Sequence, residues 1–183
     1  ADLHAARAEA MLGLGDTAGA EQAVAAALAA DPKSAAALLA QVRLQARVGK
    51  SDEAIATARE LVRLHPADGV GWSTLGTLLA AKPDYAGAEA AFTQAIEHRA
   101  QNVPDRVQRA LARVALNNLD AAQEDVDILL KRAPKYPPVH YAAGLLYTRR
   151  GEPAKAIEAL GQSYQDQPDH VPTLLFLAAN YAS

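Results

Sequence analysis

The chain has 183 residues, no cysteine and a formal charge of −3, with a pI near 5.9. The absence of cysteine excludes disulfides, cysteine-based zinc sites and thiol nucleophiles, and the charge gives no electrostatic basis for nucleic-acid binding. No apolar run approaches the ~18 residues that a membrane-spanning helix requires. Half of the residues are hydrophobic but only 5% are aromatic, which suits thin, closely packed helices.

A 34-residue period organises the whole chain. One column of the period holds proline in all units but one: Pro32, Pro66, Ala100, Pro134 and Pro168. A second column holds alanine in every unit: Ala20, Ala54, Ala88, Ala122 and Ala156. A period of this length is typical of stacked helix–turn–helix units. We therefore predict units at 1–34, 35–68, 69–102, 103–136 and 137–170, followed by half a unit at 171–183, all forming a single array.

A third column should end the first helix of each unit: Gly15, Gly49, Pro83, Asn117 and Gly151. Glycine and asparagine readily adopt the left-handed conformation that closes a helix. Proline has φ fixed at a negative value, so the turn of the third unit should differ from the others. Residues that can N-cap second helices follow directly: Asp16, Asp84 and Asn118. The prediction is an all-α chain of eleven helices.

The first helix of the fourth unit carries Arg106, Arg109 and Arg113 at core-facing positions of the repeat register. Burying three unpaired cations is prohibitive. The apolar stripe of this segment uses other residues: Val107, Ala110, Leu111 and Val114. We therefore expect an irregular helix, rotated or shifted so that the three arginines reach solvent or acidic partners.

The segment 171–183 should form the first helix of a sixth unit. Its apolar residues wrap more than one face: Leu174, Leu175, Phe176, Leu177 and Tyr181. Because contiguous apolar surface often marks an interaction site, we expect an end-on patch at Leu175 and Phe176 that supports weak self-association. The chain begins at a unit boundary and stops inside a unit, so we interpret it as a segment of a longer protein.

The third and fifth units resemble the tetratricopeptide repeat signature. The matching residues of the third unit are Trp72, Leu75, Gly76, Ala88, Phe92 and Ala95. Those of the fifth unit are Gly144, Tyr147, Gly151, Ala156 and Pro168. The resemblance covers the whole chain. It implies a right-handed α-solenoid of antiparallel helix pairs, with first helices along the concave side and Trp72 as a core anchor.

A narrower resemblance involves residues 112–123, 129–135 and 170–179. The order of residue types in these segments is similar to that in the tetratricopeptide lipoproteins of the bacterial exosortase (PEP-CTERM) system and in exopolysaccharide-export repeat proteins. This resemblance implies a bacterial protein in the periplasm or associated with the outer membrane. The lack of cysteine is compatible with periplasm and cytoplasm alike.

The family resemblance implies a non-catalytic scaffold that binds a protein or peptide on its concave face. The expected binding residues are Arg43, Arg47, Ser73, Thr77, Tyr141, Leu145, Thr148 and Arg149. The arginines favour an acidic or mixed-polarity ligand. The Lys–Asn pattern with which co-chaperone repeats bind a C-terminal carboxylate is absent. Two alternatives remain open: the substrate-selecting region of a larger enzyme such as a glycosyltransferase, and a structural spacer or self-assembly module.

No catalytic, cofactor or metal site is predicted. No two histidines have the spacing of a local metal-binding pair: His4, His65, His98, His140 and His170. His140 stands where the signature has tryptophan and should be a partly buried packing residue. Glu124, Asp125 and Asp127 are expected to form a solvated outer helix face rather than a catalytic pair.

Overall fold

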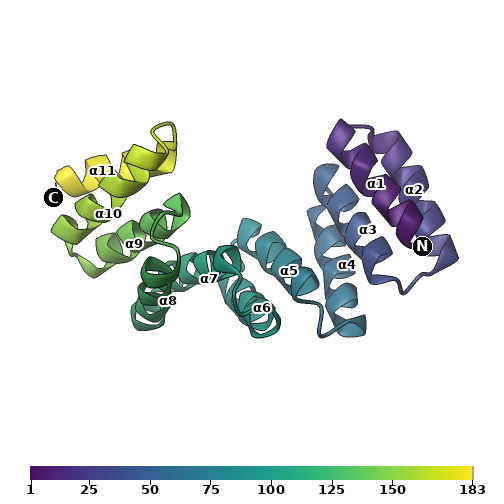
Figure 1. The fold of residues 1–183 in the computed structure, drawn as a ribbon, viewed down its shortest axis with the longest axis horizontal. Coiled ribbons are helices and arrows are strands. Elements are labelled where there is room, and N and C mark those ends of the chain that lie inside the picture. The colour runs from purple at the N-terminus through teal and green to yellow at the C-terminus, as the bar shows by residue number, and fades with distance from the viewer. Residues whose placement is uncertain (183) are drawn as a thin grey trace. The chain divides into compact units, whose positions relative to one another are not determined.

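The computed structural model describes residues 1–182, which contain eleven α-helices and no β-strand (Figure 1). The helices are α1 (Asp2–Leu14), α2 (Thr17–Ala30), α3 (Ala35–Arg47), α4 (Ser51–Leu64), α5 (Gly69–Ala81), α6 (Tyr85–His98), α7 (Val103–Ala115), α8 (Leu119–Arg132), α9 (Pro137–Arg150), α10 (Pro153–Asp166) and α11 (Val171–Tyr181). This arrangement confirms the predicted all-α chain. Every described helix is too short or too polar to cross a membrane.

The chain divides into two compact bodies. The N-terminal body, Ala1–Pro83, contains α1 to α5, and the C-terminal body begins at Asp84 and contains α6 to α11. Within each body, helices that are consecutive in the chain pack in pairs, such as α1 with α2 and α9 with α10. First helices of neighbouring repeats also pack together, α1 with α3 and α7 with α9. Each body therefore presents first helices side by side.

The turns inside four of the repeats share one geometry. Gly15, Gly49, Asn117 and Gly151 all have positive φ, between 60° and 79°. The amide of each and that of the following residue donate hydrogen bonds to carbonyls of the preceding helix, as in Gly151 to Thr148 and Glu152 to Tyr147. This pair of bonds is the standard closure of a helix by a left-handed residue, so the glycine and asparagine predictions are confirmed.

Pro83 differs from the prediction in one respect. Its φ is +27° rather than negative, so it shares the sign of φ found in the other four turns. Proline has no N–H, so the paired closing bonds of the other turns cannot form. The backbone bond from Lys82 to Leu79 is what closes α5. The third turn is thus different, as expected, but through its hydrogen bonding.

Side-chain caps begin several helices. Asp16 accepts from the Gly19 amide at 2.9 Å and Asp84 from the Gly87 amide at 3.0 Å, as predicted. Asn118 occupies the cap position of α8 without a side-chain cap bond. First helices are capped as well, by Ser34, Asp68 and Asn102. Each cap satisfies an amide that the helix itself leaves without a partner.

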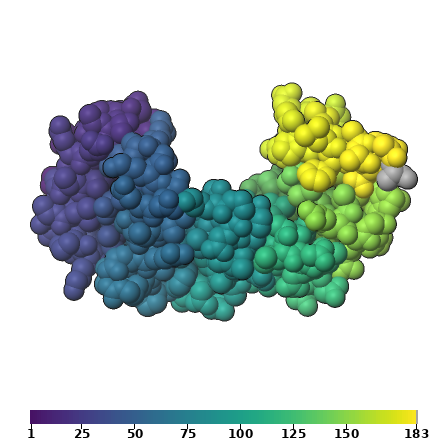
Figure 2. All heavy atoms as spheres, turned by 180° about the vertical axis from the view of Figure 1, so that it is seen from behind, coloured from purple at the N-terminus to yellow at the C-terminus, as the bar shows by residue number. Residues whose placement is uncertain are grey.

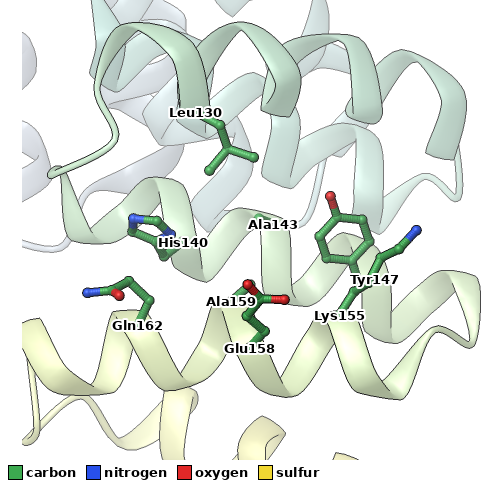
Figure 3. A pocket seen from close by; sticks show the side chains of 8 residues that line it. All are labelled: Leu130, His140, Ala143, Tyr147, Lys155, Glu158, Ala159 and Gln162. Carbon is green, nitrogen blue, oxygen red and sulfur yellow. The ribbon is translucent and has the colours of Figure 1, made fainter.

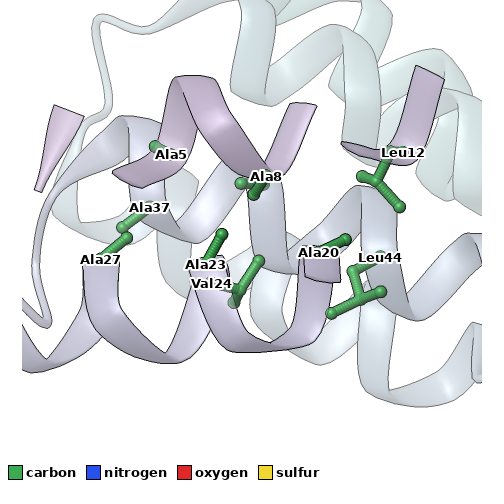
Figure 4. Close-up of a cluster of buried hydrophobic side chains, with 10 residues drawn as sticks. Ala5, Ala8, Leu12, Ala20, Ala23, Val24, Ala27, Ala37 and Leu44 are labelled. Carbon is green, nitrogen blue, oxygen red and sulfur yellow. The ribbon is translucent and has the colours of Figure 1, made fainter. Parts of the chain in front are cut away.

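Small side chains allow the paired helices to approach closely. Every member of the alanine column has no exposed surface: Ala20, Ala54, Ala88, Ala122 and Ala156. In the N-terminal body the buried cluster is mostly alanine, with Leu12, Val24 and Leu44 as its larger members (Figure 4). In the C-terminal body a Cβ built on Gly144 would lie 2.5 Å from Cγ of Leu160. The α9–α10 pair therefore requires glycine at this position.

Trp72 and His140 occupy the same repeat position and make the same contact. The indole N–H of Trp72 donates to the carbonyl of Pro66 at 2.8 Å, and Nε2 of His140 lies 2.6 Å from the carbonyl of Pro134. Both side chains are partly exposed. The prediction for His140 is confirmed, whereas Trp72 is partly exposed and so less buried than a core anchor.

Candidate binding site

Arg43 and Arg47 line a hollow of about 290 Å³ between α1 and α3. Its other lining residues are Glu9, Leu12 and Gly13, and we call it the α1–α3 hollow. Nη1 of Arg43 lies 2.5 Å from Oε2 of Glu9. Arg47 is exposed and has no ion-pair partner within residues 1–182. The hollow therefore combines an apolar wall, one paired guanidinium and one available guanidinium on a first-helix face.

Ser73 and Thr77 lie one turn apart on α5 and do not line this hollow. The hydroxyl of Thr77 donates to the Ser73 carbonyl at 2.9 Å. Thr77 is exposed and Ser73 is partly buried. Of these two predicted residues, Thr77 is the one whose side chain is exposed on the last helix of the N-terminal body.

The predicted binding residues of the fifth repeat are largely covered by α11. The Tyr141 ring packs edge-on against His170 at 4.9 Å and Phe176 at 6.5 Å between centroids, and burial raises the pKa of Tyr141. Thr148 accepts from Nδ2 of Asn180 at 2.8 Å. Leu145 is partly buried, and only Arg149 of this group is exposed.

The expected end-on patch of α11 is divided between two environments. Leu175 is 66% exposed, whereas Phe176 is partly buried against Tyr141. The side chains that α11 buries completely or nearly so are polar, Thr173 and Asn180. Leu174 and Tyr181 contribute to the surface of the C-terminal body, where α11 is yellow in Figure 2.

The three arginines of the fourth repeat lie on a regular helix, so the predicted irregularity of α7 is wrong. They converge on one carboxylate, that of Asp125, which is 1% exposed. Arg109 contacts both carboxylate oxygens, at 2.9 and 2.6 Å, and Arg106 and Arg113 add contacts at 2.9 and 2.8 Å. Arg113 also reaches Glu89 of α6 at 2.8 Å. The arginines do find acidic partners, but inside the helix packing.

We call these five residues the arginine cluster: Arg106, Arg109, Arg113, Asp125 and Glu89. The prediction that Asp125 belongs to a solvated face is wrong for this residue, because α8 turns it toward α7. Its neighbours Glu124 and Asp127 are exposed as predicted. The guanidinium groups occupy the space between α6 and α8, with side-chain exposures of only 11 to 14%.

The next groove along the C-terminal body, between α8 and α10, is open. It holds a hollow of about 380 Å³ (Figure 3). We call it the open hollow, and its lining residues are Leu130, His140, Ala143, Tyr147, Lys155, Glu158, Ala159 and Gln162. Of these, the sequence indicated only His140, as a packing residue, and Tyr147, as a residue of the repeat signature. A usable signal was the pair Ala143 and Ala159, which stand one period after Arg109 and Asp125.

The described residues hold no group of three or more His, Asp or Glu side chains that could bind a metal ion. Three of their histidines contact a backbone carbonyl or a hydroxyl: His65 the Lys33 carbonyl, His140 the Pro134 carbonyl and His170 the Thr173 hydroxyl. The candidate binding sites of the described residues are therefore hollows between helices.

A family model described as tetratricopeptide repeat matches residues 5–69, 39–106 and 107–172. The chain belongs to the tetratricopeptide repeat family. No curated protein matches the sequence at a significant level.

Solved tetratricopeptide repeat structures share the fold at low sequence identity. YrrB, described as a TPR protein with an unusual peptide-binding site, is 22% identical with a TM-score of 0.77, over 91% of this chain and 86% of that one. A TPR protein from Parabacteroides merdae is 18% identical with a TM-score of 0.83, over 97% and 71%. The type IV pilus biogenesis factor PilW is 16% identical with a TM-score of 0.84, over 98% and 85%. This chain is an all-α solenoid of the same kind.

The family signature locates the arginine cluster within the tetratricopeptide repeat. Tryptophan, leucine and tyrosine are its usual residues on the first helix. In the fourth repeat Arg106, Arg109 and Arg113 occupy these three positions. An ionic cluster there replaces the apolar contacts of an ordinary tetratricopeptide repeat.

Proposed function

We propose that this tetratricopeptide repeat scaffold binds an acidic segment of a protein partner at the α1–α3 hollow. The observation that carries the proposal is the position of Arg47, which is exposed, unpaired within residues 1–182 and located beside Arg43 on the wall of a hollow. A guanidinium recognises a carboxylate through two parallel hydrogen bonds. The apolar wall at Leu12 can take the carbon atoms of the same segment.

Arg43 contributes a second, conditional positive charge. In the unliganded chain it pairs with Glu9 at 2.5 Å, at the surface. Exposed ion pairs of this kind contribute little net stability, so a ligand carboxylate can compete for the same guanidinium at small cost. The proposed ligand is therefore a peptide with at least two acidic side chains, one for each arginine.

The cellular process in which the scaffold acts is proposed from the sequence resemblance and the family. A role in the bacterial envelope or in exopolysaccharide export rests on the resemblance of three sequence segments to proteins of those systems. A scaffold without catalytic activity agrees with the family to which the chain belongs. The peptide-binding site named for YrrB gives a precedent for ligand binding by this fold.

The test is a selection of random 12-residue peptides on the immobilised chain. We expect enriched sequences to carry clustered Asp and Glu. The double variant Arg43→Glu, Arg47→Glu should weaken the best peptide at least about tenfold, since charge-assisted hydrogen bonds are lost. It should melt at the same temperature as the parent chain, because both arginines are exposed.

Arg59→Glu is the matched control. Arg59 is an exposed arginine of the same repeat, but it lies on the second helix, α4. Equal loss of binding in Arg59→Glu would show that overall charge and not the α1–α3 hollow selects the peptide. Glu124→Lys on α8 adds positive charge outside the hollow, so a loss of binding there as large as that of the double variant would also exclude the hollow as the site.

A further inference from the structure

The open hollow has an apolar floor surrounded by polar groups. Leu130 of α8 and Ala159 of α10 supply the carbon surface, Ala143 of α9 lies buried beneath them, and Tyr147 adds its ring (Figure 3). The volume of about 380 Å³ lies at the small end of ligand pockets. It is suited to one long side chain rather than to a cofactor.

The charges around the open hollow are unbalanced. Lys155 is paired with Glu152 at 2.5 Å, and this carboxylate raises the pKa of Lys155. Its ammonium also lies 5.5 Å from the centre of the Tyr147 ring. Glu158 lines the hollow and has no ion-pair partner within residues 1–182. The hollow therefore carries one uncompensated negative charge.

The neutral polar groups of the hollow include hydrogen-bond acceptors. A proline carbonyl can only accept, so the 2.6 Å contact with Pro134 assigns the proton of neutral His140 to Nε2. Nδ1 of the same ring is then an acceptor. The amide of Gln162 and the hydroxyl of Tyr147 have no hydrogen-bond partner among the described residues. These groups suit a ligand that is rich in donors.

The preceding groove shows what such a site accepts. There Arg109 lies between α6 and α8 and forms a two-bond contact with the carboxylate of Asp125. One period later, Ala143 and Ala159 replace these two residues and leave space. Glu158 supplies a carboxylate at the rim of that space. The fourth repeat fills its groove with its own arginine, and the fifth repeat keeps the groove empty.

We infer that the open hollow binds an arginine side chain presented by another polypeptide. The guanidinium pairs with Glu158 through charge-assisted hydrogen bonds. The methylene stem covers Leu130 and Ala159. This site lies on the second-helix side of the C-terminal body and takes a ligand of opposite charge from the one proposed for the α1–α3 hollow, so the two proposals are independent.

The test is a titration of the ¹⁵N-labelled 183-residue chain with N-acetylarginine amide, followed by amide NMR shifts. Shifts should concentrate at Ala143, Glu158 and Ala159. N-acetylnorleucine amide, which has the stem without the guanidinium, should bind at least about tenfold more weakly, because it lacks the charge-assisted hydrogen bond. Equal binding of the two compounds would overturn the inference.

Glu158→Gln is the deciding variant, and Glu124→Gln is its control. Glu124 is an exposed carboxylate at the same position of the preceding repeat, beside the filled groove. Glu158→Gln should weaken N-acetylarginine amide at least about tenfold, and Glu124→Gln should leave its affinity unchanged. Unchanged affinity in Glu158→Gln would overturn the inference. The variant Arg43→Glu, Arg47→Glu should retain arginine binding, so failure of one proposal leaves the other standing.

Discussion

Two neighbouring grooves of the C-terminal body are built on the same repeat positions but have opposite contents. Between α6 and α8, Arg106, Arg109 and Arg113 meet the buried carboxylate of Asp125. Between α8 and α10, Ala143 and Ala159 leave a hollow of about 380 Å³. The two grooves differ at four positions of the repeat register, where Arg106, Arg109, Arg113 and Asp125 are followed one period later by His140, Ala143, Tyr147 and Ala159.

The charges of the filled groove are paired. The Asp125 carboxylate accepts four hydrogen bonds from three guanidinium groups, and Glu89 supplies a second carboxylate to Arg113. Buried ions are tolerated when good geometry and additional hydrogen bonds compensate for the lost hydration. The cluster also links α7 to both α6 and α8. Its hydrogen bonds are directional, whereas apolar contacts at the same positions would not depend on particular partner atoms.

The largest predicted effect is that of Asp125→Ala. Removing the shared carboxylate leaves three guanidinium groups largely buried with Glu89 as the remaining acidic partner. Breaking a buried ion pair from one side costs about 3–5 kcal/mol. We expect urea unfolding to report a loss of that size in the free energy of unfolding.

Glu124→Ala is the control for this prediction. Glu124 precedes Asp125 and is exposed, so the change should stay within about 0.5 kcal/mol. A loss below about 1 kcal/mol in Asp125→Ala would mean that the arginine cluster does not hold the filled groove together.

A smaller effect should distinguish two glycines near the open groove. A Cβ on Gly144 would lie 2.5 Å from Cγ of the fully buried Leu160, whereas a Cβ on Gly161 would meet nothing within 4 Å. We expect Gly144→Ala to destabilise by about 1–3 kcal/mol through overpacking. Gly161→Ala should stabilise by up to about 1 kcal/mol, because alanine is the better helix former.

Thermal unfolding of the two glycine variants provides the measurement. If both variants shift the melting temperature in the same direction, close packing of α9 on α10 is not what separates them. The stability of the α9–α10 pair, which forms one side of the open hollow, would then need another explanation.

The smallest predicted effect concerns the opposite face of α9. Burial raises the pKa of Tyr141 above its ordinary value of 10.0, because burial disfavours the phenolate. The neutral ring therefore contributes stability below about pH 10, and this contribution is lost as the pH rises through the pKa of the folded state. Tyr141→Phe should reduce the loss of stability at alkaline pH. Tyr181→Phe, at a 70% exposed residue, should not.

Sequence periodicity was sufficient to predict the helix pairs, because each turn depends on one residue. Gly15, Gly49, Asn117 and Gly151 close their helices as expected, and the alanine column is buried throughout. Asp16 and Asp84 cap second helices for the same local reason.

The side chains that fill each groove could not be predicted from single residues, because they depend on contacts between different helices. The burial of Asp125 depends on three arginines contributed by a different helix. The sequence around Asp125 alone therefore predicts only an exposed acidic helix face. The open hollow arises because Ala143 and Ala159 lack the larger side chains of Arg109 and Asp125. Small residues are common in this chain, so two alanines alone do not indicate a hollow. Tyr141 was assigned to a binding surface, but its contacts with His170 and Phe176 depend on how α11 docks.

The most direct test of this account transfers the filled groove into the open one. The double variant Ala143→Arg, Ala159→Asp places the Arg109–Asp125 pair one period later. We predict a folded chain whose stability lies within about 2 kcal/mol of the parent, since the new charges are paired, and whose affinity for N-acetylarginine amide falls more than about tenfold. Unchanged affinity in a folded variant, measured by the same NMR titration, would contradict the claim that these two positions decide what the groove binds.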